Sequence, residues 1–473
     1  MVILRTPKGT VDYTPEESAL INYILSTTTE VFKTHGAVNI DTPTFEHSSI
    51  LKNKFGDDQK LVFDLADQGG EEYSLRYDLT VSFARYLAQN KISKIKRYQI
   101  GKVFRRDQPV ITKGRFREFL QCDFDIAGSY ENMLADAEIL KIVSECMQNL
   151  FQNKKFTISV NHRLIHTAYL ESLNVDPTLH STICSTIDKC HKISEIEMRT
   201  EFESKGLQTC QINQILEYTK LSGKDQQFIL YLKKLKIYNR DAGKKAIDDL
   251  ELLQKYCNIF KCTDNIVFDL SLARGLDYYT GIIFEVKIND SDVGSIIGGG
   301  RYDNLVRDFV KSQELKVQQV PDINLSKTQL KKMKKRLAQV KNEDNENFEV
   351  PCVGFSLGIA RICSILKDSF KVGVSDTKVF VGCFGDRLLE ERLVLVSMLW
   401  DHNVPAETFY SNLHYKKQAA FALKAGIPIV VSIGADELID NVVKVSYGNG
   451  LEEKATVKRS DLVYFLRNII TRL

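Results

Sequence analysis

Two short segments in the second half of the chain combine a cation, hydroxyl groups and glycines in a pattern that suits a small polar ligand. Residues 271–281 read SLARGLDYYTG, in which Arg274 precedes the adjacent Tyr278 and Tyr279. Residues 298–303 read GGGRYD. An arginine provides a fixed cation and tyrosines provide directional hydroxyl groups, while successive glycines let a backbone approach a ligand closely. Both segments are therefore candidates for a binding site.

A predicted hairpin, with strands at 98–106 and 115–126, carries a second group of charged side chains. Its first strand ends in Arg105 and Arg106. Side chains alternate between the two faces of a strand, so the second strand has an apolar face and a polar face that carries Arg115, Arg117, Gln121, Asp123 and Asp125. Such a face borders either solvent or a site. The paired arginines favour a site, because a planar guanidinium matches a phosphate group.

Two more segments carry polar groups at spacings that suit a ligand. Asp78 and Thr80 present a carboxylate and a hydroxyl that can both accept from an ammonium group, although such an acid can equally cap a helix. Residues 354–366 look like a strand that turns into a helix at Gly358, with Arg361 one turn in. Many helices begin in this way, so the last pattern does not by itself indicate a site.

Together these segments resemble the sequence motifs of the histidyl-tRNA synthetase family, within the class II aminoacyl-tRNA synthetases. The stretch 36–51 around Pro43 resembles motif 1, the hairpin resembles motif 2, and residues 354–362 resemble motif 3. The two segments described first resemble the family's two histidine-specific motifs. The resemblance covers residues 3–473.

The resemblance implies a role for each candidate residue. Arg105 would hold the ATP α-phosphate, Arg274 would act on the same phosphate during activation, and Arg361 would meet the γ-phosphate. Arg115 would also bind ATP. The residues implied to bind histidine are Asp78, Leu79, Thr80, Gln121, Asp125, Arg274, Tyr278, Tyr279, Gly299 and Gly300. Mg²⁺ would arrive with ATP, and no sequence motif for a protein-bound metal is implied.

The implied reaction joins L-histidine to the 3′ end of tRNA(His) through a histidyl-adenylate made from ATP, in a homodimer built on motif 1. Two alternatives remain open at this point. Non-catalytic relatives, such as a regulatory subunit of histidine biosynthesis or the tRNA-sensing domain of a stress kinase, usually lack the motif arginines or the C-terminal domain, both present here. A nucleotide-dependent oxidoreductase is disfavoured, since a dinucleotide loop that begins at Gly298 needs glycine at position 303, which is Asp303.

The expected fold is α/β (α+β), with an antiparallel catalytic sheet, flanking helices, a helical insertion and a C-terminal α/β domain that binds the anticodon. Residues 166–262 have helix-like spacing and no proline after Pro177, and strand and helix candidates alternate after residue 372. The predicted domains are the first part of the catalytic core (1–165), the insertion (166–262), the second part of the core (263–372) and the anticodon-binding domain (373–473).

The composition of the chain says more about where the protein is located in the cell than about the reaction that the resemblance implies. The 473 residues carry a net charge of +3, which permits a nucleic-acid partner without requiring one. No apolar run is long enough for a membrane span, and the ten cysteines include no CxxC pair, which suits a reducing compartment. MVILRTPKGT resembles neither a signal peptide nor a transit peptide, so we expect a cytoplasmic protein; a mitochondrial isoform with a longer N-terminus stays open.

Two local patterns allow more than one interpretation. Residues 327–341 hold seven Lys or Arg and no acid, which is typical of a solvated helix but also suits an RNA contact. Cysteines and histidines cluster at 180–191, where irregular spacing favours ordinary helix positions over a zinc site.

Overall fold

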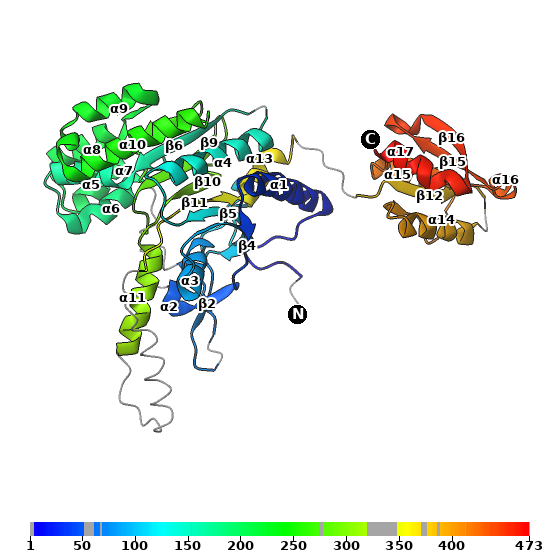
Figure 1. The fold of residues 1–473 in the computed structure, drawn as a ribbon, viewed down its shortest axis with the longest axis horizontal. Coiled ribbons are helices and arrows are strands. Elements are labelled where there is room, and N and C mark those ends of the chain that lie inside the picture. The colour runs from blue at the N-terminus through cyan, green and yellow to red at the C-terminus, as the bar shows by residue number, and fades with distance from the viewer. Residues whose placement is uncertain are drawn as a thin grey trace. The chain divides into compact units, whose positions relative to one another are not determined.

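The structure is a computed structural model that describes residues 4–51, 61–66, 69–152, 154–273, 278–318, 348–369, 376–385, 388–411 and 413–472. It contains two compact units, shown in Figure 1. The larger unit comprises residues 1–12 and 23–366, and the smaller comprises residues 13–22 and 367–473. The basic segment 327–341 lies outside the described residues.

The larger unit is built on a nine-stranded sheet. Across the sheet the strands follow the order β1 (Val38–Asn39), β4 (Ile95–Phe104), β5 (Glu118–Ala127), β11 (Cys352–Gly358), β10 (Ile297–Arg301), β9 (Ile282–Ile288), β6 (Phe156–His162), β8 (Ile266–Asp269) and β7 (Ser222–Gly223). The central strands are antiparallel, as predicted, but β1 pairs with β4 and β6 pairs with β8 in parallel. The sheet is therefore mixed. A long connection through the inserted helices separates β6 from β8, and parallel pairing requires such a crossover.

The hairpin differs from its prediction at the start of the second strand. A 3₁₀ turn at Ile111–Lys113 ends at Gly114, whose φ of 64° is left-handed, and β5 begins only at Glu118. Arg115 and Arg117 therefore precede the strand and do not share its polar face. Residues 107–117 contain a turn and a β-bridge between Val110 and Arg115, features that strand alternation cannot predict.

One face of the sheet is apolar and covered by helices. Figure 1 shows α1 (Pro15–Thr34), α4 (Leu134–Leu150) and α13 (Ile359–Leu366) over the sheet. The ring of Phe124 on β5 lies 5.1 Å from that of Phe32 on α1 and 6.1 Å from that of Phe355 on β11. Cys122, Phe124 and Ile126 are buried here, as the alternation of β5 predicts. Apolar burial on this side leaves the other face free for polar groups.

The helical region between β6 and β8 has a core of its own. Its helices are α5 (Arg163–Ser172), α6 (His180–Ile187), α7 (Glu195–Ser204), α8 (Thr209–Thr219), α9 (Asp225–Lys234) and α10 (Asp241–Ile259). Leu170, Ile183, Phe202 and Ile215 are buried together among them. In the segment 180–191, where the sequence favours ordinary helix positions over a zinc site, His180 Nε2 lies 3.2 Å from the Val175 carbonyl and His191 Nε2 lies 3.1 Å from Ser271 Oγ.

Shorter elements complete the larger unit. A two-stranded sheet joins β2 (Phe45–His47) to β3 (Tyr73–Leu75). The helices α2 (Ser48–Leu51), α3 (Thr80–Asn90) and α11 (Leu305–Gln318) accompany it, and α3 and α11 contribute to one buried cluster through Phe83 and Leu305.

The smaller unit is a five-stranded sheet with helices. Its order is β13 (Ala406–Glu407), β12 (Val379–Cys383), β14 (Ile429–Ile433), β15 (Val442–Tyr447) and β16 (Glu453–Lys458). Its helices are α14 (Leu389–Asp401), α15 (Tyr415–Lys424), α16 (Ala435–Ile439) and α17 (Leu462–Ile470). The sequence predicts β12, β14 and β15 but not the edge strands, because β16 is largely charged, a feature of edges that resist further pairing. In the described part of the chain, every helix is too short or too polar to cross a bilayer.

We expect Gly299→Ala to destabilise the larger unit. A methyl group there would lie 2.3 Å from the Gly354 carbonyl oxygen and 2.5 Å from Phe284 Cζ, and overpacking of this kind costs about 1–3 kcal/mol. Gly358→Ala is the matched control, since its nearest contact would be 3.6 Å. Thermal unfolding of both variants measures the difference, and equal midpoints would contradict the close packing of β10.

Candidate functional site

Antiparallel pairing aligns four residues on one face of the central sheet. Asp125 of β5 lies opposite Arg97 of β4 and also opposite Gly354 of β11, which lies opposite Gly300 of β10. Directly opposed residues of antiparallel strands share a face, and strand alternation adds Gln121 and Asp123 to it. We call this surface the polar face; it carries Arg97, Gln121, Asp123, Asp125, Gly300 and Gly354.

The polar face holds buried charges in close contact. Arg97 is 0% exposed, and Asp123 and Asp125 are 1% and 2% exposed. Arg97 Nη2 lies 2.6 Å from Asp125 Oδ2 and 3.9 Å from Asp123 Oδ2. The Tyr302 hydroxyl donates to the other oxygen of Asp125. Asp125 thus has a hydrogen-bond donor at one oxygen and a close ion pair at the other, whereas Asp123 is the more distant partner of Arg97.

Burial changes the ionisation of both carboxyl groups. It raises the pKa of Asp123 to about 7, a rise that Arg97 opposes and that the negative charge of Asp125 reinforces. Burial also raises the pKa of Asp125, with Arg97 and the Tyr302 hydroxyl acting in the opposite direction. One guanidinium cannot fully neutralise two buried carboxylates, so this pair binds a proton more readily than ordinary aspartates do.

Asp78 forms a second buried group at the start of α3. Its carboxylate accepts hydrogen bonds from the Val81 amide at 3.0 Å and from the Tyr278 hydroxyl at 3.1 Å. Burial raises its pKa, while the Val81 amide and Arg105 oppose that rise. Asp78 therefore caps α3, as one interpretation of the sequence expected, and also contacts Tyr278 of the first candidate segment. Leu79 is fully buried beside it, and Thr80 begins the helix.

Aromatic rings connect the two groups of acids. The ring of Tyr278 lies 5.0 Å from that of Tyr279 and 5.9 Å from that of Tyr302. Tyr278 contacts Asp78 and Tyr302 contacts Asp125, so the tyrosines join residues that are distant in sequence. Gln121 belongs to the same face, and its buried Oε1 has no hydrogen-bond partner within the described residues. Such an acceptor is suited to a ligand that can donate a hydrogen bond.

The glycines of β10 and β11 serve opposite faces. A side chain at Gly300 would reach within 2.8 Å of the Tyr279 ring, and one at Gly354 would lie 1.9 Å from Asp125 Oδ1. Both therefore leave room on the polar face. A side chain at Gly299 would instead point toward Phe284 and Phe355 on the apolar face. Of the two glycines predicted to bind the ligand, only Gly300 leaves its missing side chain on the polar face.

The predicted ATP-binding arginines have different surroundings. Arg105 Cζ lies 4.3 Å from the ring centroid of Tyr77 and 5.3 Å from that of Phe119, a cation–π arrangement that holds the guanidinium without neutralising it. Arg115 is about half-exposed, and its Nε and Nη2 lie 3.2 and 2.9 Å from Asp107 Oδ2.

The third arginine lies close to the hairpin loop. Arg361 Nη1 donates to the Ser295 carbonyl. A side chain at Gly114 would come within 2.9 Å of Arg361 Cα. Packing of the loop against the start of α13 therefore brings Arg361 near the segment that holds Arg115. Arg274 lies outside the described residues.

The sequence assigned no role to four residues of this region: Arg97, Asp123, Tyr302 and Gly354. Asp123 was placed on the polar face, and Tyr302 and Gly354 lie within candidate segments, but Arg97 was not singled out at all. The alternation rule applied to 115–126 would also have placed Arg97 and Gln99 on one face of the preceding strand. Nothing in the sequence indicates that Gly354 makes room for Asp125, since that contact depends on the strand order.

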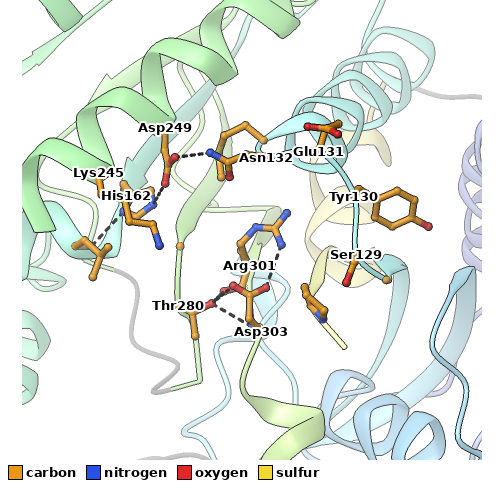
Figure 2. Close-up of a pocket in the computed structure, with 15 residues that line it drawn as sticks. Ser129, Tyr130, Glu131, Asn132, His162, Lys245, Asp249, Thr280, Arg301 and Asp303 are labelled. Atoms are coloured by element: carbon orange, nitrogen blue, oxygen red, sulfur yellow. Dashed lines mark hydrogen bonds and ion pairs between the residues drawn. The ribbon is translucent and has the colours of Figure 1, made fainter. Parts of the chain in front are cut away.

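A separate cavity of about 330 Å³ lies where β5, β6 and β10 end and β9 begins. Figure 2 shows charged side chains around it, from α10, from the loop after β5 and from the ends of β6 and β10. Asp249 accepts from Asn132 Nδ2 at 2.6 Å and lies 3.5 Å from His162 Nε2, while Arg301 Nη1 lies 3.0 Å from Asp303 Oδ1. The polar groups around the cavity therefore pair with one another, and the contact between Asp249 and His162 connects α10 to β6.

Comparison with known proteins gives a consistent result. A family model described as histidyl-tRNA synthetase matches residues 9–316, and one described as anticodon binding domain matches residues 378–469. The chain is 45% identical over 461 residues to the probable cytoplasmic histidine–tRNA ligase of Antonospora locustae, covering 97% of this chain and 95% of the relative. It is 42% identical over 468 residues to that of Encephalitozoon cuniculi, covering 98% and 99%. The crystal structure of histidyl-tRNA synthetase from Nostoc sp. PCC 7120 superposes with a TM-score of 0.77 at 26% identity, covering both chains fully.

We expect Asp123→Asn to change how stability depends on pH. A folded-state pKa of about 7, against an ordinary 3.8, means that the wild type loses stability as the pH rises from about 4 to about 7. The amide cannot ionise, so the variant should be the more stable protein at pH 8, by up to roughly 4 kcal/mol for three pKa units, and the difference should vanish near pH 4. Thermal unfolding across this range is the measurement; a difference that does not change with pH would show that Asp123 titrates normally.

Proposed function

The chain belongs to the histidyl-tRNA synthetase family and is a histidine–tRNA ligase, and we propose that it activates histidine on the polar face of the central sheet. It uses ATP. The histidine carboxylate attacks the α-phosphorus, pyrophosphate leaves, and the terminal ribose hydroxyl of tRNA then attacks the adenylate. Side chains contribute position and charge to such a transfer more than covalent chemistry.

Histidine recognition rests on one observation above all, the buried cluster that joins Asp78, Tyr278, Tyr302 and Asp125 by contacts. In this proposal Asp78 accepts from the α-ammonium group of the substrate, helped by Thr80. Asp125 accepts from an imidazole N–H, and the free Oε1 of Gln121 supplies another acceptor. Leu79, Tyr279, Gly299 and Gly300 form the walls. Buried polar groups of fixed orientation suit a small ring with two nitrogens.

The cations at the edge of the sheet are assigned to ATP. Arg105, whose guanidinium lies against two aromatic rings, is proposed to bind the α-phosphate. Arg115 and Arg361 are proposed to bind the remaining phosphates. Arg115 now pairs with Asp107 at the surface, a weak contact that a phosphate can displace. Mg²⁺ is proposed to enter with ATP and to neutralise charge on the pyrophosphate. Arg274 is proposed to stabilise charge that develops on the α-phosphate.

The remaining assignments concern domains and partners. We propose a catalytic core in two parts (1–165 and 263–372), the helical insertion (166–262), and an anticodon-binding domain (373–473) that grips tRNA(His). A homodimer through the Pro43 segment is supported by the motif 1 resemblance. The two relatives described above are named as cytoplasmic, which supports a cytoplasmic location.

Amino-acid-dependent ATP–pyrophosphate exchange tests the function directly. Histidine should drive exchange, and phenylalanine should give none, because a site that hydrogen-bonds a polar ring rejects analogues without those groups by up to roughly 10⁴–10⁵. All twenty amino acids are compared under the same conditions. Exchange with phenylalanine within about tenfold of histidine would refute the assignment, and no exchange at all would favour a non-catalytic relative.

Arg274→Ala should lower the rate of adenylate formation by about 10²–10³, by analogy with the loss of an oxyanion donor. An interaction made only in the transition state affects kcat and leaves substrate binding almost unchanged. Arg274→Lys should recover only part of the rate, since a point charge cannot reproduce the planar fork. Single-turnover activation is compared with single-turnover transfer in each variant. If transfer falls equally, or if histidine KM rises while kcat holds, Arg274 is a substrate anchor.

A further inference from the structure

We propose that Arg97 is a positioning residue for histidine recognition, which keeps Asp125 ionised and leaves the proton of the buried acid pair on Asp123. This inference rests on the proposed function, in which Asp125 accepts from the substrate imidazole. Arg97 itself does not touch the substrate. It acts by fixing the charge and orientation of the residue that does.

The first support is the imbalance of buried charge. Asp78, Asp123 and Asp125 are 4%, 1% and 2% exposed, and Arg97, at 0%, is the fully buried cation that pairs with Asp123 and Asp125. A buried charge is costly unless it is paired and hydrogen-bonded. Asp78 has Arg105 as its nearby cation, whereas Asp123 and Asp125 share Arg97. Two buried carboxylates beside one guanidinium cannot both be ionised cheaply, so the contacts that each one makes decide which of them carries the charge.

The second support is that the donors favour Asp125. Arg97 Nη2 is 2.6 Å from Asp125 but 3.9 Å from Asp123. Tyr302 donates to the remaining oxygen of Asp125. Hydrogen bonding to the ionised form and a nearby opposite charge both favour ionisation. The proton that burial retains therefore resides on Asp123, whose pKa burial raises to about 7.

The third support is that Arg97 cannot move away from this position. Its Cζ lies 4.4 Å from the Phe83 ring centroid, and its Nη1 and Nη2 donate at 3.4 Å to Gln99 Oε1 and the Leu79 carbonyl. The Leu79 contact also ties Arg97 to the segment that carries Asp78. One guanidinium thus connects both ends of the proposed histidine pocket.

Other titratable and charged groups also face the acid pair. Asp78 and Arg76 face it from the segment before α3, Tyr302 from the end of β10, and Cys352 from β11. Cys122 adjoins Asp123 on β5. Of these, Arg76 is the further cation, and its shortest contacts are to the Lys102 and Thr42 carbonyls. Arg97 is thus the cation in direct contact with Asp125.

An ionised Asp125 matters because of what it must recognise. A carboxylate only accepts hydrogen bonds, whereas a protonated carboxyl group also donates. An imidazole N–H directed at a protonated oxygen would lose its acceptor. Loss of the Arg97 charge should therefore weaken histidine binding at low pH, where Asp125 becomes protonated, and weaken it less at high pH.

The experiment measures KM for histidine and for ATP by pyrophosphate exchange between pH 6 and 9, in the wild type, Arg97→Met and Arg97→Lys. We express each result as the ratio of variant to wild type at the same pH, which removes the titration of histidine itself. For Arg97→Met the histidine KM ratio should be about 10–100 at pH 6.5 and should fall as the pH rises, since each unit of pKa above the assay pH cuts the ionised fraction about tenfold. Arg97→Lys keeps a cation, so its ratio should depend little on pH. The ATP KM ratio should stay within about threefold for both.

Two further variants separate charge from packing. Arg97→Met combined with Asp123→Asn removes the neighbouring acid as well, so it should lower the histidine KM relative to Arg97→Met alone. Tyr302→Phe removes the hydroxyl that donates to Asp125 with little change in volume, and should give a smaller rise in histidine KM with the same pH trend. This variant decides the matter if Arg97→Met does not fold.

Several outcomes would overturn the proposal. A pH-independent ratio for Arg97→Met, a parallel rise in ATP KM, or no improvement from Asp123→Asn would assign Arg97 a purely structural role. If Tyr302→Phe is the only variant that folds, an unchanged histidine KM in that variant would also contradict the proposal. A wild type without histidine-dependent exchange would instead refute the proposed function, and the two failures are therefore distinguishable.

Discussion

The ion pair between Arg97 and Asp125 joins β4 to β5, the second and third strands from one edge of the nine-stranded sheet, and most of the site depends on it. A guanidinium without solvent contact needs a carboxylate nearby. The register of β4 and β5 meets that requirement, because it sets Arg97 directly opposite Asp125. Phe83 of α3 lies against the cation, and the Leu79 carbonyl accepts from it. Segments that begin about twenty residues apart are joined at one point. The same contact fixes the face of β5 that turns away from the apolar core.

Glycines make this arrangement sterically acceptable. The carboxylate of Asp125 lies across β11 at Gly354, where any side chain would collide with it. On the next strand, Gly300 leaves space for Tyr279, while Gly299 leaves space for the aromatic core on the opposite face. Alternation therefore makes neighbouring glycines serve different purposes. Gly300 and Gly354 place no side chain on the polar face. The larger side chains that surround this face, such as Tyr278 and Tyr302, come from residues just outside the strands.

Recognition of an amino acid and binding of phosphates have different electrostatic requirements, and the proposed assignment gives them to different groups of residues. The cluster proposed to bind histidine is buried, so its hydrogen bonds are oriented before a substrate arrives and are strengthened by low polarity. The arginines assigned to ATP lie toward the hairpin loop and α13, where Arg115 is half-exposed. A multiply charged phosphate chain can be met by exposed cations that keep their hydration until binding. Gly114 packs against the start of α13, and this contact keeps Arg115 of the hairpin loop close to Arg361 of α13.

The sequence alone was sufficient for the family, the activity and most of the elements. Arginines, glycines and tyrosines at fixed spacings identify the motifs, and alternation correctly predicts which face of β5 is apolar. The sequence could not predict that Arg115 and Arg117 precede the strand, since a turn at Gly114 shortens it, or that β1 pairs with β4 and β6 with β8 in parallel across long connections. Alternation places Asp123 beside Asp125 on one face, but the sequence could not identify Arg97, Tyr302 and Gly354 as neighbours of Asp125. Local patterns depend on residues a few positions apart, whereas the ionisation of a buried carboxylate depends on which strands lie beside it, and only the tertiary structure decides that order.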